Sequence, residues 1–109
     1  MDSVKEGSAL YMTVAFTDEN DDPIVPNDVR WRVDEISDPD NPVEVVGWTV
    51  ASPASSISVT IDGTDNEILA ANASAEFEKR MVIVEMDTGL STQARQRKPY
   101  RIMNLRAAP

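Results

Sequence analysis

The segment Val29–Asp34, in which apolar and charged residues alternate one by one, constrains the fold more than any other feature of the chain. A period of two places Val29, Trp31 and Val33 on one face of an extended strand and the charged residues between them on the other face. Such a strand buries its apolar face in a core and exposes the other face to water. Because four other segments repeat the pattern, the sequence predicts an all-β domain whose strands share one hydrophobic core.

Turn-forming residues and prolines separate the segments that have strand character. The apolar run Met81–Val84 is typical of a strand at the centre of a sheet, and Gly89 in the turn 88–91 predicts a hairpin. Gly47 predicts a bulge or bend, and Pro99 predicts the beginning of a strand or the edge of a sheet. We therefore expect strands over residues 8–17, 29–34, 43–51, 56–62 and 77–87, and a final strand over 100–105.

One segment has helical signals. Thr64 and Glu67 have the spacing of a capping box, so one or two helical turns are predicted over residues 66–71. Six or seven short strands with one short helical crossover are the pattern of an antiparallel β-sandwich of immunoglobulin-like architecture, with a partly open β-barrel as the alternative. Trp31 and Trp48 are predicted to fill the core. The expected organisation is a flexible N-terminus over residues 1–7, a single sandwich domain over 8–106 and a C-terminal tail over 107–109.

The amino-acid composition limits the chemistry that the chain can perform. Its 109 residues include no cysteine, which excludes disulfides, thiolate chemistry and cysteine-based metal sites. They include no histidine either, which removes the usual general base near neutral pH and the commonest metal ligand. An enzyme that uses carboxylates is the alternative that remains open. We expect a non-enzymatic protein with no cofactor, no metal site and no small-molecule substrate.

Charge is distributed unevenly along the chain, whose net charge is −9. Residues 1–78 contain 17 acidic and three basic residues, whereas residues 79–109 contain seven basic and two acidic residues. This asymmetry predicts a surface with opposite charge poles. The alternative is an ordinary solvated surface whose charge keeps the domain soluble.

A basic stretch near the end of the chain is the clearest candidate for an interface. A protein partner with an acidic surface, such as another copy of this chain, suits the stretch better than nucleic acid, because the strongly acidic remainder repels a polyanion. The alternative is that the positive charges only protect an edge strand from pairing. The candidate interface residues are Arg95, Arg97, Lys98 and Arg101 on the basic side and Asp18, Asp21, Asp22, Asp38 and Asp40 on the acidic side.

Asp18, Asn20 and Asp22 also match the first three ligand positions of a calcium loop. The match ends there, because Pro23 stands where the glycine of the sharp turn belongs and Val29 where the bidentate glutamate belongs. We therefore expect an acidic β-turn at this position rather than a calcium site.

Five runs carry a resemblance to a known family: Glu6–Asn20, Val29–Asp34, Trp48–Thr49, Ser55–Ile61 and Tyr100–Leu105. In these runs the chain resembles small immunoglobulin-like sandwich proteins that are encoded in the virion-structural gene clusters of tailed bacteriophages and prophages. The resemblance implies a head–tail or tail component of the virion that acts by protein–protein contacts and carries no catalytic motif. It implies other phage structural proteins, or copies of the same protein, as partners.

The first seven residues lack the basic start and apolar run of a signal peptide, and no apolar stretch is long enough to cross a bilayer. We therefore expect synthesis inside the cell and no membrane partner. The resemblance implies that this compartment is the bacterial cytoplasm and that the protein is associated with the virion. The alternative function is a binding domain that presents its loops to a carbohydrate or a cell-surface ligand.

Overall fold

The structure is a computed structural model, and it describes residues 2–18, 20–38, 40–69, 72, 75–87 and 93–104. Within these residues the chain forms seven strands and no α-helix, which confirms the predicted all-β class. No helix in this part of the chain is long and apolar enough to span a membrane. The strands are β1 (Asp2–Lys5), β2 (Leu10–Ala15), β3 (Asp28–Glu35), β4 (Val43–Ala51), β5 (Ser56–Ile61), β6 (Phe77–Asp87) and β7 (Gln93–Met103).

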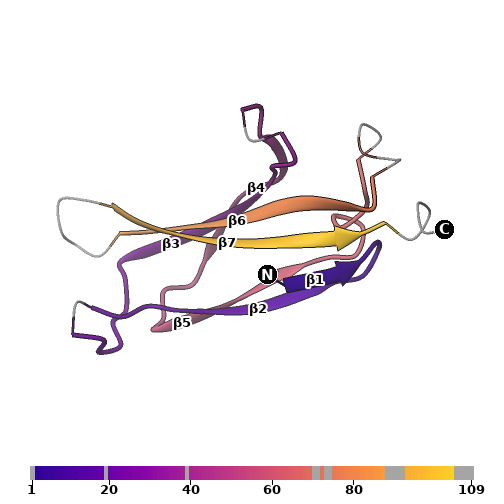
Figure 1. Cartoon of the computed structure of the whole chain (residues 1–109). Helices are drawn as coiled ribbons and strands as arrows, with labels where there is room; N and C mark the ends of the chain where they lie inside the picture. Colours follow the sequence, from indigo (N-terminus) through magenta and orange to yellow (C-terminus); the bar gives the residue numbers. More distant parts are fainter. Residues whose placement is uncertain are drawn as a thin grey trace.

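The strands form two sheets that lie in two layers (Figure 1). The larger sheet has the strand order β1-β7-β6-β3-β4, and the smaller sheet pairs β2 with β5. Every pair is antiparallel except β1 and β7, which run parallel, so the expected purely antiparallel arrangement is corrected to a mixed one. Among the described residues no strand pair joins the two sheets, so the chain does not adopt the alternative barrel.

The hydrophobic core lies between the two sheets because alternate residues of each strand point inward. In β3 the side chains of Val29, Trp31 and Val33 are buried, as the alternation predicted. The three apolar residues of β5 are buried in the same way, while the serines and threonine between them are exposed. The other buried apolar residues are Leu10, Val14, Phe16, Val82, Val84, Met86, Tyr100 and Ile102.

The details predicted from single residues in the strands are also found. The strand that contains Met81–Val84 is β6, and it lies between β7 and β3 in the middle of the larger sheet. The register between β3 and β4 shifts so that Gly47 and Trp48 together lie opposite Arg32, which is the predicted bulge. Pro99 lies on a stretch of β7 that has an open edge, because β1 covers only Tyr100 to Met103. The predicted turn 88–91 lies outside the described residues.

The helical crossover predicted over residues 66–71 is wrong in the part that the structure describes, because residues 66–69 have turn and irregular backbone. The reason is a fully buried ion pair on β6. The guanidinium of Arg80 donates to the carbonyl oxygens of Asp65 and Glu67 at 2.8 Å each, and the carboxylate of Glu78 accepts the backbone N–H of Leu69 at 2.9 Å. These tertiary bonds satisfy backbone groups that a helix would have paired along its own axis.

The N-terminal segment differs from the expected flexible arm, because residues 2–5 form β1 against β7. After β1 the chain turns at Gly7, whose φ of 80° suits glycine. The backbone N–H of Gly7 donates to the carbonyl of Asn66 at 3.0 Å, and a Cβ on Gly63 would lie 2.2 Å from the carbonyl oxygen of Gly7. This close approach of two backbones holds the connection before β2 against the connection after β5. The predicted tail 107–109 lies outside the described residues.

Candidate functional site

The outer face of the larger sheet gathers six of the ten basic residues of the chain. Residues directly opposite one another on neighbouring strands point to the same face of a sheet. Arg30 of β3 therefore shares a row with Glu85 of β6 and Arg95 of β7, and the next row contains Arg32, Ile83 and Arg97. Lys79 and Arg101 form a further row. The name "basic face" is used below for Arg30, Arg32, Lys79, Arg95, Arg97 and Arg101.

A buried carboxylate organises one end of the basic face. The side chain of Glu85 is 3% exposed and lies between two arginines that are each about half exposed. Its Oε1 accepts bonds from Nε and Nη2 of Arg30 at 3.1 and 2.6 Å, and its Oε2 accepts a bond from Nε of Arg95 at 2.9 Å. The hydrogen bonds from Arg30, helped by those from Arg95, hold the pKa of Glu85 below its usual value even though burial raises it. One ionised carboxylate thus fixes two guanidiniums and leaves the group with a net positive charge.

Trp48 completes the other side of the cluster. The ring centroid of Trp48 lies 4.1 Å from the Cζ atom of Arg30 and 5.5 Å from that of Arg32. Both distances are within the range of cation–π attraction. The prediction that Trp48 fills the core is therefore wrong, because the bulge at Gly47 places both residues opposite Arg32 and the half-buried indole covers the arginines of β3 on the outer face.

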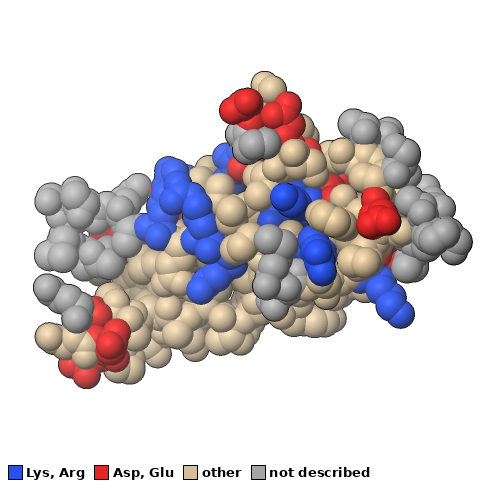
Figure 2. All heavy atoms as spheres, viewed as in Figure 1, with Lys and Arg blue, Asp and Glu red and all other residues tan. Residues whose placement is uncertain are grey.

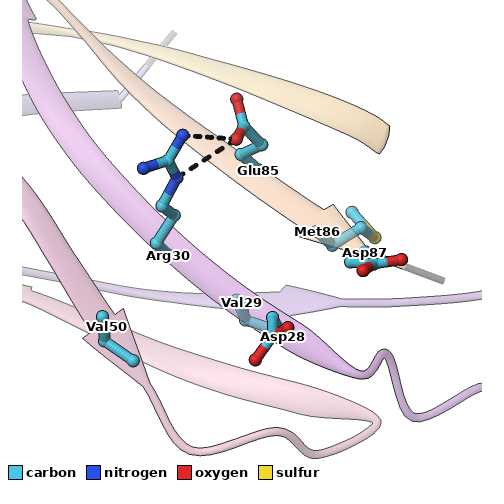
Figure 3. A pocket seen from close by; sticks show the side chains of 7 residues that line it. All are labelled: Asp28, Val29, Arg30, Val50, Glu85, Met86 and Asp87. Atoms are coloured by element: carbon cyan, nitrogen blue, oxygen red, sulfur yellow. Dashed lines mark hydrogen bonds and ion pairs between the residues drawn. The ribbon is translucent and has the colours of Figure 1, made fainter. Parts of the chain in front are cut away.

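A hollow of about 230 Å³ lies at the end of this face, between β3, β4 and β6. In Figure 3 the side chain of Arg30 extends from β3 toward Glu85 on β6, while Asp28 and Asp87 lie nearer the ends of their strands. Asp28 and Asp87 are opposite each other in the register, and Val50 at the rim is 82% exposed. Among the described residues no group of three or more acidic, histidine or cysteine side chains could hold a metal ion. The hollow is thus a bay at the end of the basic face, where carboxylates and an apolar side chain meet the Arg30–Glu85 pair.

The structure divides the predicted basic residues between the two sides of β7. Arg95, Arg97 and Arg101 belong to the basic face, whereas Lys98 alternates to the opposite side, where its register partner is the buried Val82. Lys98 remains exposed on that side. The basic sequence stretch is therefore not one surface, and only its odd-numbered positions share the outer face.

The predicted acidic residues lie in two separate turns. Asp18, Asp21 and Asp22 belong to the connection from β2 to β3, and Asp38 and Asp40 belong to the connection from β3 to β4. Figure 2 shows acidic side chains at separate margins of the molecule and Lys and Arg side chains over the middle of the visible face. Positive charge thus lies between the acidic turns in this view and not at one end of the molecule.

Both acidic turns use an aspartate to hold the backbone. The Oδ1 atom of Asp18 accepts the backbone N–H groups of Asn20 and Asp22 at 2.8 and 3.0 Å. The Oδ1 atom of Asp38 accepts the backbone N–H of Asp40 at 3.1 Å in the same way. These are Asx-type turns, in which a short carboxylate replaces a backbone acceptor.

Sequence reasoning missed half of the candidate site. The alternation in β3 placed Arg30 and Arg32 on a solvent face, but their neighbours depend on which strands flank β3. Glu85 was not predicted as a site residue, because its strand has the apolar pattern of a strand at the buried centre of a sheet. Arg80 was counted with the basic end of the chain, and its side chain is in fact fully buried against Glu78.

No protein-family model, curated protein or solved structure matches the chain.

Proposed function

We propose that the protein is a non-enzymatic interaction module that binds an acidic protein surface through the basic face. The observation that carries this proposal is that six cations lie on one sheet face of a chain whose net charge is −9, where they outnumber the carboxylates of Asp28, Asp34, Glu85 and Asp87. A face of this kind attracts and orients a partner of opposite charge. Glu85 and Trp48 hold Arg30, Arg32 and Arg95 in place beforehand, which lowers the entropy lost on binding.

An immunoglobulin-like topology is part of the proposal. The order β7-β6-β3-β4 corresponds to strands G, F, C and C′ of an immunoglobulin-like sandwich, and the pair β2-β5 corresponds to strands B and E. The connection from β4 to β5 passes directly from one sheet to the other, so the described residues contain no strand in the place of D. This strand order supports the fold that the alternation predicted.

A place among the virion components of a tailed phage or prophage is the more specific form of the proposal. It is supported by the resemblance in strand pattern and by a surface suited to protein contacts. Its partners are then neighbouring structural proteins that present acidic surfaces, or copies of this chain. Detection of the chain in purified particles after prophage induction, at a fixed copy number per particle, tests this form of the proposal. Particles that lack the chain contradict it.

The alternative of a loop-borne carbohydrate site has less support. Aromatic side chains are the usual platform for sugars, and none of the six aromatic residues lies at the tip of a connection. Tyr11 is 73% exposed but lies on β2, and Trp48 is covered by Arg30. Quenching of tryptophan fluorescence by added sugars would restore this alternative.

The experiment that tests the basic face compares Arg97→Glu with Lys98→Glu. The two substitutions change the net charge equally at adjacent positions, but only Arg97 belongs to the basic face. Polyglutamate labelled with a fluorophore serves as the acidic probe, and its anisotropy is measured at low salt and again at high salt. We expect Arg97→Glu to weaken binding about tenfold and Lys98→Glu to have less than half that effect on the free energy of binding.

Two results contradict the proposal. The first is equal weakening by both variants, which would mean that only net charge matters. The second is the absence of salt-sensitive binding by the unmodified protein. Tighter binding of a DNA duplex than of polyglutamate, with the same dependence on Arg97, would assign the face to nucleic acid instead.

A further inference from the structure

The smaller sheet has an outer face without any charged side chain. The strands β2 and β5 contain no acidic or basic residue, although 27% of the residues of the chain are charged. Their outward side chains are those of Tyr11, Thr13 and Ala15 on β2 and of Ser56, Ser58 and Thr60 on β5, and all six are exposed. The name "hydroxyl face" is used below for these six residues.

The strand β5 also has one edge that no described strand covers. The N–H of Phe16 donates to the carbonyl of Ser55 at 2.9 Å, which sets the phase of the ladder between β2 and β5. Backbone groups in an antiparallel ladder point alternately toward and away from the partner strand. The N–H and C=O groups of Ser56, Ser58 and Thr60 therefore point away from β2. No other described strand pairs with this edge.

This edge lacks the devices that natural sheets use against pairing with other chains. Edge strands are usually interrupted by a bulge, a proline or a charge. On the larger sheet, β4 contains Glu44 and the bulge at Gly47, and β7 carries Pro99 and four cations. On the smaller sheet, the outward carbonyl of Ala15 on β2 accepts a bond from the amide of Gln96 at 3.2 Å. The strand β5 contains none of these features.

We propose that β5 pairs antiparallel with β5 of a second copy of this chain across a two-fold axis at Ser58. The strand is symmetric in character about Ser58, so this register places Ser56 opposite Thr60 and Ile57 opposite Val59. Hydroxyl residues then face hydroxyl residues outside, and β-branched apolar residues face each other over the core. The outward backbone groups of Ser56, Ser58 and Thr60 meet their counterparts as hydrogen-bonded pairs.

The distribution of charge favours a second copy of this chain as the partner at this edge. Two chains of net charge −9 repel each other at most orientations, and an approach through the strands of the smaller sheet brings no charged strand residue into contact. An isologous contact of this kind closes after two copies. The two smaller sheets join into one sheet with the order β2-β5-β5-β2, and both basic faces remain accessible.

The first test measures mass in solution by light scattering across protein concentration at low and at high salt. We expect a dimer whose dissociation constant changes little with salt, because no charged residue lies in the contact. Ser58→Lys raises that constant about fivefold or more, since two lysines then oppose each other at the axis. Thr13→Lys is the matched control, because Thr13 is the register partner of Ser58 on β2 and adds the same charge to the same face away from the axis.

The second test uses the absence of cysteine from the chain. A Ser58→Cys variant places two thiols on opposed residues whose Cα atoms are about 5.5 Å apart, a separation that a disulfide can span. We expect covalent dimers under mild oxidation from Ser58→Cys and few from Thr13→Cys. A monomer at every concentration, an equal loss of dimer in both lysine variants, or equal cross-linking of both cysteine variants overturns the proposal. Because the basic face is untouched, Ser58→Lys still binds polyglutamate if the protein is folded.

Discussion

The two outer faces of the sandwich are built on the same inner pattern but differ in every property that a partner would detect. The basic face of the larger sheet carries six cations, and a buried carboxylate and an indole hold three of them, Arg30, Arg32 and Arg95, in place. The hydroxyl face of the smaller sheet carries none, and apart from Tyr11 its side chains are short. Alternation requires apolar residues only at inward positions, so the outward positions of each sheet are free to specify a different contact.

The difference teaches that one small sandwich has two kinds of contact available to it. Binding through the basic face depends on charge, and therefore weakens in high salt. Pairing through β5 depends on backbone hydrogen bonds and packing, and therefore resists salt. Arg97→Glu and Ser58→Lys should each weaken one behaviour and spare the other. A single variant that weakens both binding through the basic face and pairing through β5 would show that the two contacts are not independent.

The largest expected effect concerns the scaffold that both faces share. Glu78→Ala leaves the fully buried guanidinium of Arg80 without its counter-ion and removes the acceptor of the Leu69 N–H. Loss of one partner of a buried ion pair typically costs about 3–5 kcal/mol of stability. Urea denaturation measures the change, and Glu76→Ala is the control, because Glu76 is exposed two residues earlier. A loss below about 1 kcal/mol would mean that water reaches Arg80 and that the pair is not structural.

Features that depend on interactions within one segment could be predicted from the sequence, and features that depend on contacts between distant segments could not. The strands β2 to β6 were predicted because their apolar patterns are local to each strand. The last strand was predicted only over residues 100–105, whereas β7 begins at Gln93, because residues 93–99 contain no alternation of apolar and polar residues. The strand β1 was missed because its four residues are extended only through parallel pairing with β7, at the far end of the chain. The helix was predicted from the local spacing of Thr64 and Glu67, but bonds from Arg80 and Glu78 decide the backbone there.

The candidate site follows the same rule. Alternation within one strand is enough to separate Arg95 and Arg97 from their neighbours once the strand is known. The cluster of Arg30, Glu85 and Arg95 spans three strands, and only the order of strands in the sheet brings them into one row. Likewise, no local pattern indicates that β5 lies at the edge of its sheet, because edge position depends on the order of the strands.

A smaller effect tests the link between the two sheets. The hydroxyl of buried Tyr100 donates to Oδ1 of Asn66 at 2.8 Å, and Nδ2 of Asn66 donates to the carbonyl of Ser8 just before β2. Tyr100→Phe leaves a buried acceptor unpaired and should cost about 1–2 kcal/mol. Chemical denaturation at pH 7 measures this loss.

The same tyrosine predicts a dependence on alkaline pH. Burial raises the pKa of Tyr100 to about 12 from an ordinary value of 10.0, so the folded state holds the proton more tightly than the unfolded chain. This contribution to stability is fully present below pH 10 and is lost as the pH rises toward 12. The unmodified protein should therefore lose its advantage over Tyr100→Phe across that range. A constant difference between the two proteins would place the hydroxyl in contact with water.

The smallest expected effect is a loss of stability at low pH that involves the basic face and not the hydroxyl face. Because Arg30 and Arg95 lower the pKa of Glu85, the ionised carboxylate contributes stability that is present above the ordinary pKa of 4.5 and is lost as the pH falls through the lowered folded value. Glu85→Gln removes the charge and should cost about 1 kcal/mol at pH 7, since both arginines are half exposed. Its difference in stability from the unmodified protein should shrink as the pH drops below 4.5.

Dimerisation through β5 should not depend on Glu85, because no titratable side chain lies on that strand. A Glu85→Gln variant that changes the dimer would show that the two faces are coupled through the core, and would replace the comparison with a single cooperative surface.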